Sequence, residues 1–185
     1  SKAELLSRLT SAQSTLTLND TSVTKFERNK IINKVFGNSI KNSFKILDTD
    51  VIEDDDCIQL SASHNGYEGI FGCVHKRKIS INKKTKNLKG CDKLVKKKDG
   101  KPLNYSIRFH LYPGLAAVKT MSGNGVLIQQ SKNKSLLFTI KDESITLEKS
   151  IFLGRNKILE NTCVTVSGNL VNKDKAVHWE IKRNI

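Results

Sequence analysis

The stretch Tyr105-Ser106-Ile107-Arg108-Phe109-His110-Leu111 decides the fold class, because apolar and polar residues alternate strictly along it. Successive side chains of a β-strand point to opposite faces of its sheet. The apolar residues of this stretch therefore face a core, and Ser106, Arg108 and His110 face away from it. Such alternation is typical of a strand that is buried on one face only.

Runs with the same strand character recur along the chain and are separated by turn signals such as Asn65-Gly66, Asp99-Gly100 and Pro113-Gly114. The runs cover residues 14–18, 57–62, 70–81, 125–130, 135–140, 145–153, 162–167 and 176–182. Many short strands at such spacing predict an all-β fold. We expect a large antiparallel β-sandwich, supersandwich-like, with about 11–13 strands.

One region departs from this pattern. Residues 24–36 carry Phe26, Ile31, Ile32 and Val35 at loose spacing, which predicts a short helical or irregular excursion. No internal repeat or linker divides the chain, so residues 1–185 are expected to form a single β-sandwich domain. Strand character begins almost at once and no methionine precedes it, so we expect the C-terminal fragment of a longer protein.

The net charge is high: 32 Lys and Arg against 18 Asp and Glu give +14. Such a charge attracts polyanions, whether acidic polysaccharide, nucleic acid or anionic membrane. A lysine- and asparagine-rich composition also arises from A/T-rich codon usage without any functional selection. Aromatic residues make up only 6% of the chain, whereas single-strand binders stack bases on aromatic side chains. The low aromatic content therefore counts against a basic nucleic-acid-binding β domain, which stays an alternative beside a purely structural module.

The chain lacks the sequence patterns of several other classes. No stretch approaches the ~20 apolar residues of a membrane span, and no membrane partner is expected. The four cysteines form no C-x-x-C pair, so a zinc site is not expected, and a disulfide stays open. Asp54-Asp55-Asp56 is interpreted as a solvated turn. Without a G-x-S-x-G elbow or a phosphate loop, we expect neither an independent catalytic site nor a cofactor.

Three motifs carry a resemblance to a known family. In order, they are residues 62–67 followed by 71–77, residues 107–114, and residues 147–154 leading to 162–168. Their order and spacing, with the Ser14-Thr15-Leu16 strand ahead of them, are similar to those of heparinase II/III-like proteins of bacteria. The resemblance covers essentially the whole chain but only the C-terminal β-sandwich of that polysaccharide lyase family.

The resemblance implies a function. Full-length members pair an N-terminal α/α toroid with a β-sandwich and cleave uronate-containing polysaccharides, such as glycosaminoglycans, by β-elimination. This chain would then frame the substrate cleft beside the toroid, which is its expected partner together with an acidic polysaccharide. Alone it is expected to be inactive, and whether the chain counts as an enzyme stays open. Its location, in the periplasm or the cytoplasm of a bacterium, is open too.

One family position falls within the chain and departs from the pattern. Relatives commonly carry a His just before the first strand, and some members use it as a metal ligand, whereas this chain has Gln13. An amide oxygen is a poor zinc ligand beside an imidazole. We therefore predict no bound metal.

Six residues are candidates for binding the polysaccharide. His64 precedes the Asn65-Gly66 turn and either reaches a ligand or braces that turn. The Tyr67 ring either stacks on a sugar or covers the edge of the core, and the core interpretation is favoured. The full set of predicted substrate-binding residues is His64, Tyr67, His75, Arg77, Arg108 and His110.

The basic members of this set raise a second pair of alternatives. His75 and Arg77 share one face of a predicted strand, and Arg108 and His110 lie opposite the apolar face of residues 105–111. Arg77 can bind a sulfate or carboxylate through two parallel hydrogen bonds, or it can pair with a carboxylate of the protein. Together the four side chains would make a basic surface for an anionic chain.

Overall fold

The computed structural model describes residues 6–27, 29, 31, 34–35, 37, 40–42, 44–154, 157–171 and 173–184. The elements that have defined bounds within the described residues are strands and the short helical stretches η1 and α3. In chain order these are η1 Thr10–Ala12, β1 Leu16–Leu18, β2 Lys25–Phe26, β3 Ile40–Asn42, β4 Ile46–Glu53, β5 Cys57–Tyr67, α3 Glu68–Phe71, β6 Cys73–Asn82, β7 Leu88–Lys96, β8 Leu103–His110, β9 Ala116–Lys119, β10 Gly125–Ser131, β11 Lys134–Ile140, β12 Ser144–Gly154, β13 Lys157–Leu170 and β14 Lys175–Asn184. None of the described helices is long and apolar enough to cross a membrane.

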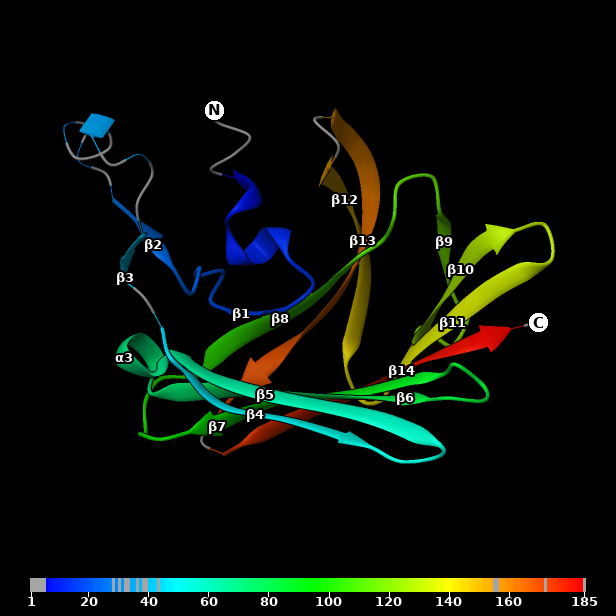
Figure 1. Ribbon diagram of the computed structural model, residues 1–185, viewed down its shortest axis with the longest axis horizontal. Coiled ribbons are helices and arrows are strands. Elements are labelled where there is room, and N and C mark those ends of the chain that lie inside the picture. Colours follow the sequence, from blue (N-terminus) through cyan, green and yellow to red (C-terminus); the bar gives the residue numbers. More distant parts are fainter. Residues whose placement is uncertain are drawn as a thin grey trace.

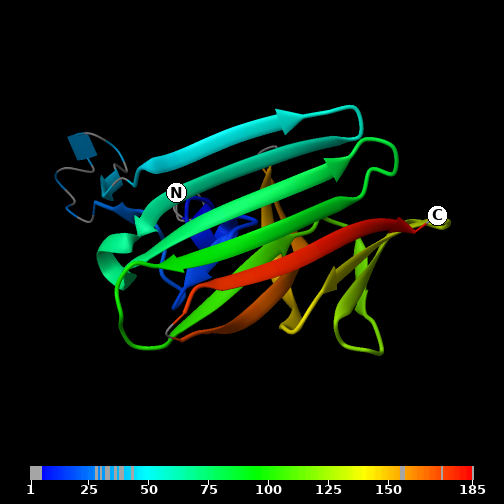
Figure 2. The same ribbon diagram turned by 90° about the horizontal axis from the view of Figure 1, so that it is seen from below.

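Two antiparallel sheets pack against each other, which confirms the predicted β-sandwich (Figure 1). The large sheet has eight strands in the order β4-β5-β6-β7-β14-β11-β10-β9, and the small sheet has four in the order β1-β8-β13-β12. Together these two sheets hold 12 strands, within the predicted range of 11–13, and β2 and β3 form a separate two-stranded sheet that brings the described strands to 14. Figure 2 shows β4, β5, β6, β7 and β14 side by side across the large sheet.

The predicted alternation of residues 105–111 is confirmed. Tyr105 and Ile107 are buried, and β8 pairs with β1 on one side and β13 on the other. The apolar side chains of β8 pack in one core with residues of the large sheet. The centroid of the Phe109 ring lies 4.9 Å from that of Phe138 and 5.0 Å from that of Trp179. Burying a side chain of this size contributes about 1.5–3 kcal/mol, so this layer between the sheets is the main source of stability.

The turn after β5 differs from the prediction. Asn65 and Gly66 lie within β5, where the register with β6 shifts between His64 and Tyr67. The reversal is made instead by α3, so Ile70 and Phe71 are helical rather than extended. Gly66 suits the irregular position because a Cβ there would collide with the Val23 side chain. A dipeptide that favours turns also favours a bulge, and tertiary packing decides between them.

Strand β4 was not predicted, because all of its residues are exposed. Its sequence therefore shows no alternation of apolar and polar residues. The acidic residues that follow it form the expected turn, in which Asp54 accepts hydrogen bonds from the backbone N–H groups of Asp56 and Cys57. The four cysteines are free thiols. Of the predicted excursion, the structure describes residues 24–27, 29, 31, 34 and 35, which include strand β2 and helical residues at Ile31, Lys34 and Val35; residues 28, 30, 32, 33 and 36 lie outside the described residues.

Candidate functional site

A buried carboxylate links three strands of the large sheet. Asp92 on β7 is fully buried and accepts hydrogen bonds from His75 Nε2 at 2.7 Å, from Arg77 Nε at 2.7 Å and Nη2 at 3.0 Å, and from Trp179 Nε1 at 2.9 Å. Burial alone would raise the pKa of the Asp92 carboxyl. The hydrogen bond from His75 and the charge of Arg77 outweigh burial and hold the pKa below its usual range.

Gly90 makes room for one of these donors. It lies opposite Trp179 in the β7–β14 pair, and a Cβ on Gly90 would occupy the space of the indole ring. The ring therefore lies across β7, and its N–H reaches the Asp92 carboxylate. A glycine within a strand often marks such a close approach.

Two histidines extend the cluster toward the surface. The backbone N–H of Gly66 donates to Nδ1 of His64, and Nε2 of His64 lies 3.2 Å from Nδ1 of His75. Because Nδ1 accepts from Gly66, neutral His64 carries its proton on Nε2, which faces His75. Burial, and next the electrostatic interaction with His75, lower the pKa of His64 to about 4. We call His64, His75, Arg77, Asp92 and Trp179 the Asp92 cluster.

Acid should weaken the fold through His64. Its folded pKa of about 4 lies below the ordinary histidine value of 6.5, so stability is complete above about pH 6.5, falls as the pH drops toward 4, and levels off below that. The difference corresponds to at most about 3 kcal/mol; because His64 is only partly buried and water screens it, we expect about 2 kcal/mol. Urea unfolding between pH 7 and pH 4 should show a smaller loss for His64→Gln than for the parent chain. The exposed control His178→Gln should follow the parent, and an identical pH dependence in all three would contradict the assignment.

The N-terminal segment, residues 7–20, is held from both sheets. Arg77 of the large sheet donates from Nη1 to the Ser14 carbonyl. From the small sheet, His110 Nε2 donates to the Ser11 carbonyl at 3.0 Å, and Arg108 donates to Thr17 Oγ1 at 2.8 Å and to Asp20 at 3.1 Å. These contacts fix the course of the segment over β8 (Figure 1).

The structure thus separates the six predicted residues into three places. His64, His75 and Arg77 lie together in the Asp92 cluster, and Arg108 and His110 lie on β8 beneath the N-terminal segment. Tyr67 is fully buried, and its hydroxyl donates to the carbonyls of Leu16 and Thr21. Its ring therefore packs in the core and offers no face to a sugar.

Both arginines have carboxylate partners within the chain, and for Arg77 this is the second alternative that the sequence left open. Arg77 pairs with Asp92 and Arg108 with Asp20. Each side chain is mostly buried, with 19% and 16% of its surface exposed. The contacts give both residues a positioning role, and direct binding of polysaccharide by them stays a prediction.

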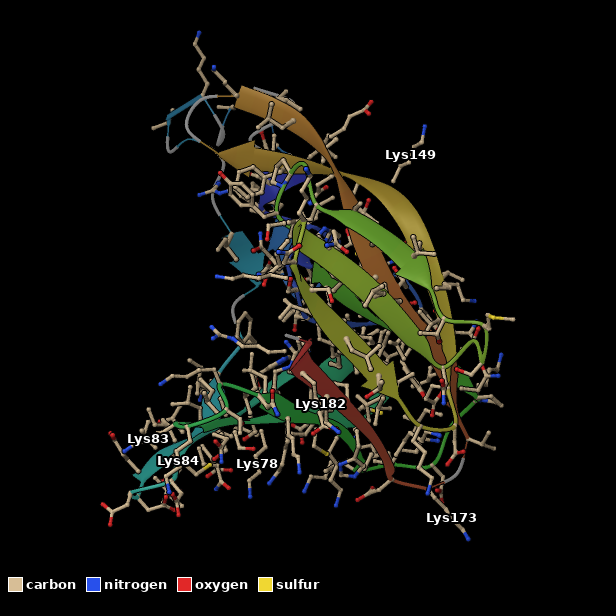
Figure 3. All side chains as sticks on the ribbon, turned by 90° about the vertical axis from the view of Figure 1, so that its right-hand side faces the viewer. Lys78, Lys83, Lys84, Lys149, Lys173 and Lys182 are labelled. Atoms are coloured by element: carbon tan, nitrogen blue, oxygen red, sulfur yellow. The ribbon has the colours of Figure 1, made fainter. Side chains whose placement is uncertain are left out.

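The lysines are spread over the molecule rather than collected at this cluster. Figure 3 shows Lys78, Lys83 and Lys84 along the large sheet and Lys149 on the far side, on β12. Lys83 and Lys84 are paired with Glu53 and Asp56, each at 2.7 Å. The net charge of +14 is therefore weaker evidence for a defined polyanion site than its size indicates.

A pocket of about 380 Å³ lies between the N-terminal segment and the ends of β8, β12 and β13. Sequence patterns did not predict it, because its walls come from three distant parts of the chain. Tyr112 and Phe152 stood in the motifs of the resemblance, and that was the only signal for them. The lining residues are Ser7, Ala12, Gln13, Ser14, His110, Leu111, Tyr112, Ile151, Phe152, Leu153 and Asn161. We call it the Asn161 pocket.

The residues beside Gln13 do not fit a metal. Its side-chain nitrogen donates to the Ser7 carbonyl at 2.8 Å. In the part of the chain that the structure describes, no three His, Cys, Asp or Glu side chains are grouped so that they could hold a metal ion. A zinc site needs at least three such protein ligands, so no step of the chemistry is assigned to a metal here.

Fold and site together define a large antiparallel β-sandwich with a pocket of about 380 Å³ at one end of its small sheet. The family model for heparinase II/III-like proteins, C-terminal, matches residues 2–180, and the chain belongs to this family. Among curated proteins, none matches it in sequence.

Solved structures agree with the assignment of the fold. The chain is similar to the heparan sulfate lyase HepC from Pedobacter heparinus, with a TM-score of 0.74 and 15% identity over 98% of this chain and 25% of that one. It is also similar to a crystal structure of heparinase III, with a TM-score of 0.69 and 16% identity over 98% of this chain and 25% of that one. The chain therefore spans about a quarter of the length of these proteins.

Proposed function

We propose that this chain is the C-terminal β-sandwich of a polysaccharide lyase that cleaves acidic, uronate-containing polysaccharide, and that it frames the substrate cleft. The observation that carries the proposal is the family match, which extends over residues 2–180. The resemblance implies that an α/α toroid supplies the other wall of the cleft. The N-terminal segment and the Asn161 pocket form the wall on the side of the sandwich.

The chemistry of β-elimination explains why the toroid and the sandwich would have different roles. The proton next to a uronate carboxylate is weakly acidic, so an enzyme must neutralise the carboxylate while a positioned base removes that proton. In relatives the residues that exchange protons lie mainly on the toroid. In this chain, Arg77, Arg108 and His110 would act by holding the N-terminal segment in place, with the other members of the Asp92 cluster fixing Arg77.

Two measurements on the isolated chain test the proposal. It should be retained on heparin–agarose, elute as salt rises because the attraction is electrostatic, and pass through unmodified agarose. Incubation with heparin, heparan sulfate or alginate should give no ultraviolet absorbance from unsaturated uronate. Product that increases with protein concentration would refute the inactivity of the segment.

A parallel titration with single-stranded DNA tests the alternative partner. The proposal predicts weaker binding to DNA than to heparin at equal salt. Tighter binding that ignores sequence and quenches aromatic fluorescence would replace it with a nucleic-acid-binding function. Binding to neither polymer would leave a purely structural module.

A further inference from the structure

The Asn161 pocket contains a buried acceptor without a donor. Asn161 on β13 is 9% exposed, and its Nδ2 donates to the Leu111 carbonyl at 2.8 Å. That bond fixes the amide orientation, since a flipped amide would set two oxygens against each other. Oδ1 is shielded from solvent and has no hydrogen-bond partner. A buried oxygen of this kind favours a ligand that brings a hydroxyl or N–H donor.

Aromatic rings form another wall of the same pocket. The Tyr112 and Phe152 rings pack edge to face with centroids 5.5 Å apart. Tyr112 is 63% exposed, although it is large and partly apolar. An exposed aromatic face suits the apolar face of a pyranose ring, and the contact with Phe152 holds it in a fixed orientation.

The pocket offers no charge to an acidic group. Among its described lining residues there is no Lys, Arg, Asp or Glu. The His110 imidazole has both nitrogens engaged, with Nε2 at the Ser11 carbonyl and Nδ1 3.1 Å from Ser150 Oγ. A carboxylate or sulfate that entered would lose water without gaining a cation, which is costly.

We propose that the Asn161 pocket binds an uncharged, hydroxyl-bearing pyranose ring: the neutral sugar of an acidic polysaccharide rather than its uronate. Tyr112 stacks on the ring, and Asn161 Oδ1 accepts a hydrogen bond from a ring substituent. The assignment rests on the proposed function and adds to it which sugar of the polymer lies against the sandwich. The acidic groups on either side of that sugar would then face away from the pocket.

Titration followed by amide chemical shifts in nuclear magnetic resonance tests this assignment, with N-acetylglucosamine and glucuronate as separate probes. N-acetylglucosamine should shift the amides of residues 110–112, 150–153 and 161 saturably, whereas glucuronate at equal concentration should not. Tyr112→Ala should weaken binding about tenfold, and Asn161→Leu about fivefold or more. Met121→Ala, which removes a fully exposed side chain elsewhere, should bind like the parent chain. Because Tyr112 is exposed, its variant keeps the test valid even if Asn161→Leu does not fold.

Two results would overturn the assignment. One is glucuronate shifting the same amides as strongly as N-acetylglucosamine; the other is Tyr112→Ala binding as tightly as the parent. If heparin is still retained while N-acetylglucosamine leaves the pocket amides unshifted, the pocket assignment fails and the proposed function stands. If the unmodified chain did not bind heparin, both the pocket assignment and the proposed function would be refuted.

Discussion

Substituting Asp92 by Asn is expected to lower the free energy of unfolding by about 3–5 kcal/mol. The carboxylate is fully buried and accepts four hydrogen bonds, two of them from Arg77. An amide of the same shape cannot balance the guanidinium charge, and its NH₂ group faces other donors. Removing one partner of a buried ion pair leaves the other uncompensated, which is the costly case.

The matched control is Asp20→Asn, which makes the same chemical change at an exposed partner of Arg108. The Asp20 side chain is 80% exposed, and exposed pairs contribute about 0–1 kcal/mol. Asn also tolerates the left-handed backbone at this position, where φ is 50°. Urea unfolding monitored by circular dichroism gives both values. If Asp92→Asn lowered the free energy of unfolding by no more than Asp20→Asn does, the Asp92 cluster would not stabilise the fold.

Substituting Gly90 by Ala is expected to destabilise the protein by about 3 kcal/mol. The added methyl group would overlap the Trp179 ring, so the indole must move out of the core and give up its hydrogen bond to Asp92. The expected loss combines overpacking with a broken hydrogen bond to a charged group. Trp179 is the only tryptophan of the chain, so its fluorescence reports the displacement directly.

Gly100→Ala provides the control for this prediction, because a Cβ there meets nothing within 4 Å. The Gly90 variant should show a red-shifted emission spectrum and a lower urea midpoint, and the Gly100 variant should show neither. An unchanged emission spectrum in Gly90→Ala would mean that the indole does not lie across β7.

Sequence patterns predicted the sandwich because its strands are buried on one face. Tyr105 and Ile107 alternate with polar residues, so their burial could be inferred without a structure. The same reasoning failed for β4, where both faces are exposed and no periodicity forms. It also failed at Asn65-Gly66, because the local preference for a turn says nothing about the packing of Val23 against Gly66.

The candidate site was predicted less completely, since its geometry depends on pairing between distant strands. The shared face of His75 and Arg77 followed from their spacing, but the identity of their partner did not. Asp92 faces them only because β6 and β7 pair with Arg77 opposite Asp92. The Asn161 pocket combines residues 7, 12–14, 110–112, 151–153 and 161, and no local pattern indicates that these segments meet.

The location of bound polysaccharide tests the central claim most directly. Amide chemical shifts should be measured while an oligosaccharide of alternating uronate and N-acetylglucosamine is titrated into the chain. If the sandwich frames the substrate cleft, the shifts should concentrate in the N-terminal segment, in residues 110–112 and 150–153, and at Asn161. Shifts concentrated instead on the lysine-bearing outer face of the large sheet, around Lys76, Lys78 and Lys93, would contradict the claim and leave only a diffuse attraction between opposite charges.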